Sequence, residues 1–353
     1  MPVRVVTSRS HDDHQGGSPR ILRLPHSELP EPPGGSIGPI RIGLINNMPD
    51  AAFKATERQF VSLLDAASES IEVRLSLYTL PSIPRTEPNV RRTASHYSSV
   101  ETLWNAGLDG LDGLIVTGKD PVSADLRDEP CWGMMTRVLD WAHENTHSTV
   151  WSCLAAHAAV LHMDGIRRRR CGEKDFGVFE CARVSEHPLL AGAPPRFNIP
   201  HSRWNGVDAE DLEARGYRVL AHTADAGVDT FVKEGKSLFV FFQGHPEYER
   251  DTLLREYRRD VERYFRHEAS VHPSIPRGYF DRRTERALAA LREKAISGPG
   301  DELCAHFATA LKTSAIEDTW HRTAARIYRN WLEQIRARKN ASQRQNHDHA
   351  KIA

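Results

Sequence analysis

A cysteine directly follows a short apolar segment that is typical of a buried strand. The segment is Ser148–Ser152 (STVWS). Cys153 follows it and directly precedes the run LAAHAAVLH, which has helical character. In open parallel sheets, ligands bind beyond the carboxyl ends of the strands. A cysteine at such a junction lies at a helix N-terminus, where the helix dipole favours thiolate over thiol. Cys153 is therefore a candidate nucleophile, although a small buried core cysteine would also suit this position.

A histidine and a glutamate follow a second apolar strand, Leu238–Phe242 (LFVFF). His245 and Glu247 are two residues apart, and in extended backbone such residues point to the same face. Glu247 can then hold the imidazole of His245 while the imidazole accepts a proton. A histidine that caps a sheet edge beside Pro246 would explain His245 alone. A thiol at one strand end and a His-x-Glu at another favour catalysis instead.

A glycine closes a third apolar segment, Leu111–Thr117 (LDGLIVT). Gly118 would leave its backbone N–H accessible at the edge of the sheet. Together with the N–H of Leu154, it could stabilise the oxyanion of a tetrahedral intermediate. Glycines commonly end strands, so this hypothesis depends on the cysteine and the histidine.

The composition of the 353-residue chain restricts the classes of function. The 47 Lys and Arg residues balance the 47 Asp and Glu residues, whereas a nucleic-acid or anionic-membrane partner would favour a basic excess. The run Arg167–Arg170 is interpreted as a solvated loop, although the phosphates of a coenzyme would suit it. Five irregularly spaced cysteines do not indicate a disulfide framework or a zinc site. Neither a signal peptide nor a membrane span is recognisable, so we expect a cytoplasmic protein that needs no metal.

Strand-like and helix-like segments alternate through the central part of the chain. The expected strands are residues 40–46, 72–78, 111–117, 148–152, 229–232 and 238–242, and the expected helices are residues 52–67, 132–144 and 251–266. Such alternation predicts a three-layer α/β fold with a mainly parallel sheet.

Several short motifs carry a resemblance to known families. The first resemblance is to the triad of the class I glutamine amidotransferase-like superfamily, whose fold is flavodoxin-like. It is carried by the chain order Cys153, His245, Glu247, in which the glutamate follows two residues after the histidine. More motifs are similar to those of the homoserine O-succinyltransferase family of methionine biosynthesis: Asn47-Met48-Pro49, Thr56-Glu57 with Gln59-Phe60, Gly113–Gly118, Asp164-Gly165-Ile166, Glu173-Lys174 with Gly177-Val178, Pro200–Arg203, Gly244–Tyr248 and Arg259–Glu262. The match spans residues 40–266 and continues weakly to residues 330–332.

The resemblance implies roles for individual residues. Cys153 would carry an acyl thioester, His245 would accept a proton and Glu247 would be its partner. The substrate-binding positions of the family fall on Lys174, Ser202 and Arg259. The planar fork of Arg259 suits a substrate carboxylate, although an exposed charge in an arginine-rich segment would also explain this residue.

The resemblance also implies a domain organisation. Residues 1–38, rich in Pro and Gly, would be a flexible arm, and residues 39–268 an amidotransferase-like acyltransferase domain. Residues 269–340 would be a helical extension that packs on the core, with Trp320 and Trp331 as anchors. Residues 341–353 are expected to be a disordered tail.

The implied reaction is a ping-pong transfer of an acyl group from acyl-CoA to L-homoserine. The resemblance also implies that the enzyme is a homodimer and that it uses acyl-CoA as a co-substrate without any cofactor. In the family, a residue in the loop after Gly118 influences the choice of acyl group: glutamate accompanies acetyl and glycine accompanies succinyl. Counting without gaps places Val122 there. The absence of glutamate favours succinyl-CoA, because a carboxylate would repel a succinyl group; acetyl-CoA stays open.

Three other functions remain open: a glutamine amidotransferase, a cysteine hydrolase on the same fold, and a non-catalytic binding protein. Nothing in the sequence resembles the synthase domain to which an amidotransferase delivers ammonia. The intact set of Cys153, His245 and Glu247 argues against a binding protein.

Overall fold

One continuous sheet forms the centre of the molecule. The computed structural model describes residues 3–7, 22–25, 38–105, 110–298 and 301–352. Within these residues, eleven of the twelve strands follow the order β2-β1-β4-β3-β6-β7-β12-β11-β10-β8-β9, and the twelfth, β5, pairs with β4. The strands are β1 (Val3–Thr7), β2 (Leu22–Pro25), β3 (Ile40–Ile45), β4 (Val73–Thr79), β5 (Ser98–Ser99), β6 (Gly113–Val116), β7 (Ser148–Ser152), β8 (Arg169–Arg183), β9 (Arg196–Gly206), β10 (Arg218–Thr223), β11 (Gly227–Lys233) and β12 (Leu238–Phe242).

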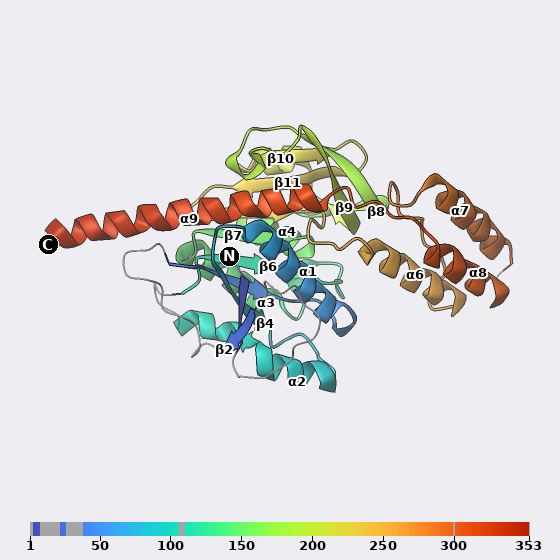
Figure 1. Cartoon of the computed structure of the whole chain (residues 1–353), viewed down its shortest axis with the longest axis horizontal. Coiled ribbons are helices and arrows are strands. Elements are labelled where there is room, and N and C mark those ends of the chain that lie inside the picture. Colours follow the sequence, from blue (N-terminus) through green and yellow to red (C-terminus); the bar gives the residue numbers. More distant parts are fainter. Residues whose placement is uncertain (1–2, 8–21, 26–37, 106–109, 299–300, 353) are drawn as a thin grey trace.

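Helices cover both faces of this sheet (Figure 1). They are α1 (Asp50–Ser68), α2 (Glu87–His96), α3 (Trp132–Asn145), α4 (Leu154–Asp164), α5 (Ala209–Glu213), α6 (Thr252–Phe265), α7 (Arg282–Ser297), α8 (Asp301–Lys312) and α9 (His321–Ile352). Helices α1 and α9 contribute to one apolar core, and α3 and α4 to the core on the opposite face. Every residue of β6, β7 and β12 is buried, as expected for parallel strands covered on both faces. The predicted three-layer α/β fold is confirmed.

The sheet has a parallel part and an antiparallel part. Strands β1 to β7 pair in parallel with one another, and β12 pairs in parallel with β7. On its other side, β12 pairs antiparallel with β11, and the pairs from β11 through β10 and β8 to β9 are antiparallel as well. In the parallel part, Ser152 of β7 lies opposite Phe242 of β12, and Val116 of β6 lies opposite Trp151. The residues that follow β6, β7 and β12 therefore meet at one edge of the sheet. In the antiparallel part, Arg169 and Arg170 begin β8, so only part of the arginine run is the loop that we predicted.

Two short strands lie within the segment that was predicted to be a flexible arm. β1 pairs in parallel with β4 and β2 pairs with β1, and Val3 and Val5 are fully buried. Alternating apolar residues allow VRVVT to extend the sheet, despite the polar composition around it. Residues 1–2, 8–21 and 26–37 lie outside the described residues.

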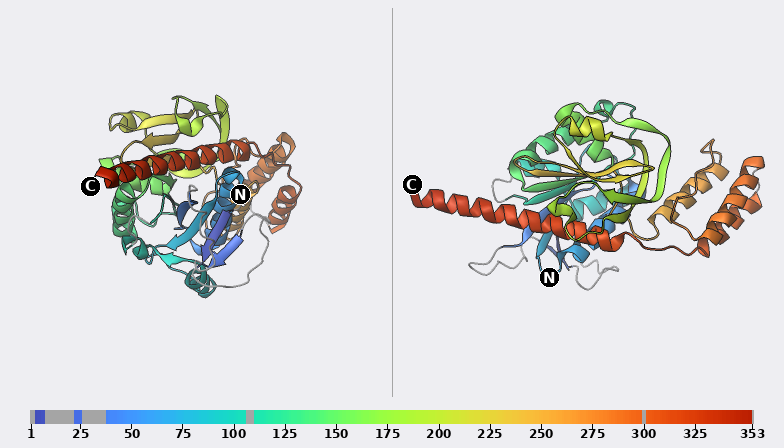
Figure 2. Two further views of the ribbon diagram at one scale, coloured as in Figure 1. Left: turned by 60° about the vertical axis from the view of Figure 1, so that its left-hand side comes forward. Right: turned by 90° about the horizontal axis from the view of Figure 1, so that it is seen from above.

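The C-terminal helices make two kinds of contact with the core. Helices α6, α7 and α8 share an apolar cluster with Phe176 and Trp320 and lie together at one side of the molecule, while α9 runs across the sheet (Figures 1 and 2). α9 continues to Ile352, so the residues predicted to form a disordered tail are helical up to that point. Residues 321–352 contain neither Gly nor Pro, which permits an uninterrupted helix. In the described residues, no helix has the length and apolar character needed to cross a lipid bilayer.

Candidate active site

Cys153 occupies a strained turn between β7 and α4. Its backbone has φ 52° and ψ −113°, a region that residues other than glycine rarely adopt and that costs about 1–3 kcal/mol. Its N–H donates to the carbonyl of Phe242 (2.7 Å), and its carbonyl accepts from the N–H of His157 (3.2 Å). The neighbouring strand and the helix together therefore hold the turn, as in a nucleophile elbow.

His245 and Glu247 form a hydrogen-bonded pair after β12. Nδ1 of His245 lies 2.8 Å from Oε1 of Glu247, so the ring donates its Nδ1–H to the carboxylate and leaves Nε2 for another partner. The side chain of Cys153 lies near enough to His245 to raise the pKa of the imidazole. The ring of Tyr248 stacks on the imidazole, with 4.3 Å between ring centroids. The structure thus brings the three residues of the predicted triad together.

The charge state of His245 follows from these neighbours. Burial alone would lower the pKa of His245, but the carboxylate of Glu247 and the side chain of Cys153 raise it well above its ordinary value. The imidazolium is stabilised because it lies between two groups that carry or can carry negative charge. His245 is therefore favoured in its protonated, imidazolium form.

Gly118 and Leu154 lie close together beside Cys153. A Cβ atom at Gly118 would be 2.9 Å from the backbone N of Leu154 and 3.1 Å from the carbonyl O of Ser152, so only glycine allows this approach. Asn47 holds the preceding residue, because its N–H donates to Thr117 Oγ1 (2.8 Å) and its side-chain amide donates to the carbonyl of Thr117 (2.9 Å). The two backbone groups predicted for the oxyanion are therefore neighbours.

A glutamate that the sequence analysis did not single out links Ser202 to the histidine. Glu256 of α6 accepts hydrogen bonds from Ser202 Oγ and Tyr248 Oη, both at 2.6 Å, and Tyr248 is the residue that stacks on His245. The hydroxyl of Ser202 is thus engaged with a carboxylate at the edge of the site.

Lys174 and Arg259 share a second acidic residue, Asp260. Nζ of Lys174 lies 3.6 Å from Asp260 Oδ2, and Nη2 of Arg259 lies 2.8 Å from Asp260 Oδ1. The side chain of Arg259 is half exposed, and it interacts electrostatically with Glu256 as well. Ser202, Lys174 and Arg259, the three residues predicted to bind substrate, are therefore linked to one another through the carboxylates of Glu256 and Asp260.

Val122 lies in a loop that a buried carboxylate holds. Its side chain is 77% exposed, and its N–H donates to Glu129 Oε1 (2.7 Å), as does the N–H of Ser123 (2.6 Å). Lys119 pairs with the other oxygen of Glu129. Glu129 thus fixes the loop after Gly118 without help from the Val122 side chain.

A fully buried histidine–aspartate pair supports the turn before His245. Nε2 of His201 lies 3.2 Å from Asp229 Oδ1, which also accepts the N–H of Gly244 (3.1 Å). His201 Nδ1 accepts from Arg203 Nε (3.2 Å). Cys181 lies close enough that its Sγ, His201 and Asp229 could share a metal ion, but His201 already accepts from Arg203 and Asp229 already accepts from Gly244 of the turn. We interpret the pair as a positioning device for His245.

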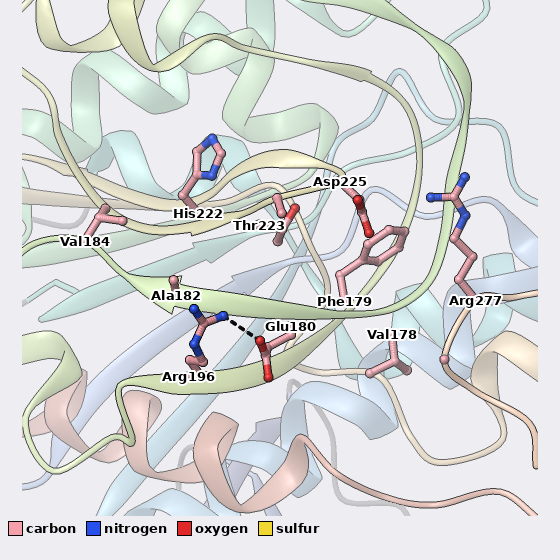
Figure 3. Close-up of a pocket in the computed structure, with 12 residues that line it drawn as sticks. Val178, Phe179, Glu180, Ala182, Val184, Arg196, His222, Thr223, Asp225 and Arg277 are labelled. Atoms are coloured by element: carbon pink, nitrogen blue, oxygen red, sulfur yellow. Dashed lines mark hydrogen bonds and ion pairs between the residues drawn. The ribbon is translucent and has the colours of Figure 1, made fainter.

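A surface hollow lies away from the predicted site residues. It has a volume of 520 Å³ and lies between β8, β10 and the segment around Arg277. Figure 3 shows Asp225 and His222 on its upper side and the ion pair of Arg196 with Glu180 below. None of the predicted catalytic or substrate-binding residues lines it.

Sequence reasoning missed Glu256, Asp260, Tyr248 and the His201–Asp229 pair as parts of the site. Tyr248, His201 and Asp260 stand within motifs that carried the family resemblance, and this was a signal that could have found them. Glu256 lies outside these motifs, in a charged helix where the pattern resembles an ordinary exposed surface.

The chain has relatives among known proteins. The family model described as homoserine O-succinyltransferase matches residues 32–341. A homoserine O-succinyltransferase of Rhodopseudomonas palustris is 46% identical over 83% of this chain and 87% of its own length. One of Methylorubrum extorquens is 43% identical over 83% and 86%. Among solved structures, a glutamine amidotransferase of Methylobacillus flagellatus has 12% identity and a TM-score of 0.47, with 85% of this chain and 96% of that chain covered.

The fold and the arrangement of cysteine, histidine and glutamate define a three-layer α/β protein with a cysteine–histidine–glutamate triad at the carboxyl edge of its sheet. The extent of the sequence match narrows this class further. The chain belongs to the homoserine O-succinyltransferase family, a family of acyltransferases, and the predicted resemblance is confirmed.

Proposed function

We propose that this chain transfers a succinyl group from succinyl-CoA to the hydroxyl of L-homoserine, with Cys153 as the covalent carrier. The observation that carries the proposal is the contact of Cys153 with the His245–Glu247 pair at the carboxyl edge of the sheet, in a chain of this family. The names of its relatives support the substrates.

In the first half of the reaction, the thiolate of Cys153 attacks the thioester carbonyl of succinyl-CoA. The N–H groups of Gly118 and Leu154 stabilise the oxyanion of the tetrahedral intermediate. When the carbon–sulfur bond to coenzyme A breaks, the imidazolium of His245 supplies the proton that coenzyme A takes as a thiol. One thioester replaces another, so this half is close to neutral in free energy.

In the second half, homoserine binds beside the acyl-enzyme. Nε2 of His245 accepts the proton of the substrate hydroxyl as the oxygen attacks the acyl carbon. The bond to Cys153 breaks, the thiolate returns and an oxygen ester leaves. The carboxylate of Glu247 stabilises the imidazolium that forms at this step.

Arg259, Lys174 and Ser202 are the proposed acceptor site. Arg259 is half exposed, so a substrate carboxylate can reach its planar fork and form a bidentate pair. Lys174 adds positive charge close by, and Ser202 offers a hydroxyl next to His245. The charge of Asp260 between Lys174 and Arg259 keeps the two cations near each other before the substrate binds.

The wider setting is also part of the proposal. We propose that the enzyme acts in the cytoplasm as a homodimer, in methionine biosynthesis, and uses acyl-CoA as a co-substrate without a resident cofactor or metal. Val122 lies in the loop that influences the acyl group in the family, and the absence of glutamate at this position supports succinyl-CoA.

The test is an assay of the purified chain with succinyl-CoA or acetyl-CoA and L-homoserine. We expect release of free coenzyme A and formation of O-succinylhomoserine, with the higher kcat/KM for succinyl-CoA. A clear preference for acetyl-CoA would contradict the proposed donor. Release of ammonia from glutamine, without acyl transfer, would favour an amidotransferase instead.

A further inference from the structure

Arg168 extends from the link between α4 and β8 toward the loop that follows Gly118. Its Nη2 lies 3.2 Å from the carbonyl O of Ala124 and 3.5 Å from that of Ser123. The side chain is half-buried and interacts electrostatically with Cys153. The guanidinium therefore contacts the loop that contains Val122 and lies within electrostatic range of Cys153.

The acidic residues around Arg168 already have cationic partners. Glu129 pairs with Lys119 and accepts the N–H groups of Val122 and Ser123. Asp125 accepts from Arg127 Nε at 3.0 Å. In the described part of the chain, the hydrogen bonds of Arg168 go to carbonyl oxygens, which leaves its charge uncompensated by an ion pair.

The other arginines near Arg168 are paired with a carboxylate, stacked on a ring or exposed. Arg169 pairs with Asp211 at 2.9 Å and also with Asp208, Arg170 stacks over Trp204, and Arg203 lies 3.1 Å from Asp175. Arg167 is exposed and contributes electrostatically to Asp125. A partly desolvated guanidinium without an ion pair, in contact with the loop after Gly118 and within electrostatic range of Cys153, is suited to an anion supplied by a ligand.

We propose that Arg168 binds the distal carboxylate of the succinyl group, both in succinyl-CoA and after the group is attached to Cys153, and thereby selects a dicarboxylic acyl group over an uncharged one. This inference rests on the proposed function. Its physical basis is the planar fork of arginine, which matches a carboxylate in geometry as well as charge. The exposed side chain of Val122 adds no charge to this part of the site.

The experiment is a competition between two donors of equal chain length. The protein is mixed with equal amounts of succinyl-CoA and butyryl-CoA without homoserine, and intact-protein mass spectrometry gives the ratio of the two adducts. Butyryl lacks only the carboxylate, so this ratio measures the recognition of the charge. It counts only protein that acylates, so partial misfolding of a variant does not alter it.

We expect the wild-type protein to carry mainly succinyl. Arg168→Met should lower the ratio of succinyl to butyryl adduct by about one to two powers of ten, the range of a charge-assisted hydrogen bond, and Arg168→Lys should retain part of the preference. The matched control, Arg167→Met, should keep the wild-type ratio. An unchanged ratio in Arg168→Met, even with slower acylation by both donors, would overturn the inference. Failure of the proposed function itself would show separately, as the absence of any acyl adduct on the wild-type protein.

Discussion

Cys153 differs from the other cysteines in its backbone and in its partner. Cys131 also precedes a helix, α3, but it has ordinary helical backbone angles, and burial raises the pKa of its thiol. Cys153 has a positive φ and contacts His245. A helix start alone therefore does not distinguish the proposed nucleophile; the strained turn and the neighbouring histidine do.

Replacement of Cys153 by Ala should abolish acyl transfer, because no other thiol contacts the His245–Glu247 pair in the described residues. Cys131→Ala is the matched control and should keep most of the activity. The measurement is coenzyme A release together with circular dichroism. Loss of transfer in a normally folded Cys131→Ala protein would refute the assignment of Cys153 as the only essential cysteine.

Glu247 and Arg259 should affect different kinetic constants. Glu247→Ala should lower kcat strongly with little change in the KM for homoserine, because the carboxylate stabilises the imidazolium that forms during the reaction. Arg259→Ala should raise this KM by about one to two powers of ten, the loss of a charge-assisted pair, and leave acylation of Cys153 intact. The measurements are steady-state kinetics and single-turnover acylation. A block of acylation in Arg259→Ala would remove Arg259 from the acceptor site.

The raised pKa of His245 predicts a pH dependence with a definite sign. The folded pKa lies above the unfolded value of about 6.5, so the pair stabilises the fold fully below the unfolded pKa and loses this contribution as the pH rises through the folded pKa. The difference in free energy of unfolding between the wild type and His245→Gln should therefore shrink with rising pH. In Glu247→Gln, NMR titration should show a lower pKa for His245. A constant difference and an unshifted pKa would contradict the role of Glu247.

The turn between β12 and α6 shows how elements place a catalytic group. Gly244 packs against β9 and β11, where a Cβ atom would meet Ile199 Cγ2 at 2.5 Å and Asp229 Oδ1 at 2.6 Å. The His201–Asp229 pair is fully buried, and the Gly244 N–H, His201 and Thr230 hold the pKa of Asp229 below its usual range despite burial. The position of His245 therefore depends on two antiparallel strands as well as on the strand that precedes it.

Gly244→Ala should displace this turn and lower kcat by at least a power of ten, because a small misplacement of a catalytic group is costly. The added methyl should also destabilise the fold by about 1–3 kcal/mol. Gly172→Ala is the control, because no atom lies within 4 Å of a Cβ there. Kinetics and thermal unfolding of both variants measure the effects, and full activity of Gly244→Ala would show that the turn does not position His245.

The parallel strands and the triad were predictable for a physical reason. Continuous apolar runs such as LFVFF mark strands buried on both faces, and parallel strands place their carboxyl ends at one edge. The antiparallel strands β8 and β9 were not predicted, because many of their residues are partly exposed and their pairing is long-range. Glu256 and Arg168 lie among other charged residues, and only the folded chain distinguishes those that face the site.

The C-terminal extension is joined to the core of the molecule by two buried tryptophans, one of which contacts the loop that contains His245. Trp320 is fully buried, and its indole N–H donates to the carbonyl of Tyr248 at 2.8 Å. Trp331 of α9 is equally buried and donates to Ser148 Oγ at 2.8 Å. Tyr248 stacks on His245, so the first contact reaches the catalytic loop, whereas the second anchors α9 to β7.

These two tryptophans predict different effects of similar substitutions. Trp320→Phe should lower the free energy of unfolding by about 1–3 kcal/mol, because the carbonyl of Tyr248 is left without its donor. The same variant should also lower kcat, because Tyr248 loses a support. Trp331→Phe should lower stability with little change in kcat. Chemical unfolding and steady-state kinetics measure both. Equal kcat values in the two variants would show that the extension does not act on the catalytic loop.

The most direct test of the account is to trap the acyl-enzyme. Wild-type protein is mixed with succinyl-CoA without homoserine, quenched in acid and digested, and the modified peptide is identified by mass spectrometry. We predict one succinyl group on Cys153, which disappears when L-homoserine is added before the quench and is recovered as O-succinylhomoserine. A succinyl group on another residue, or an adduct at Cys153 that homoserine does not remove, would contradict the account.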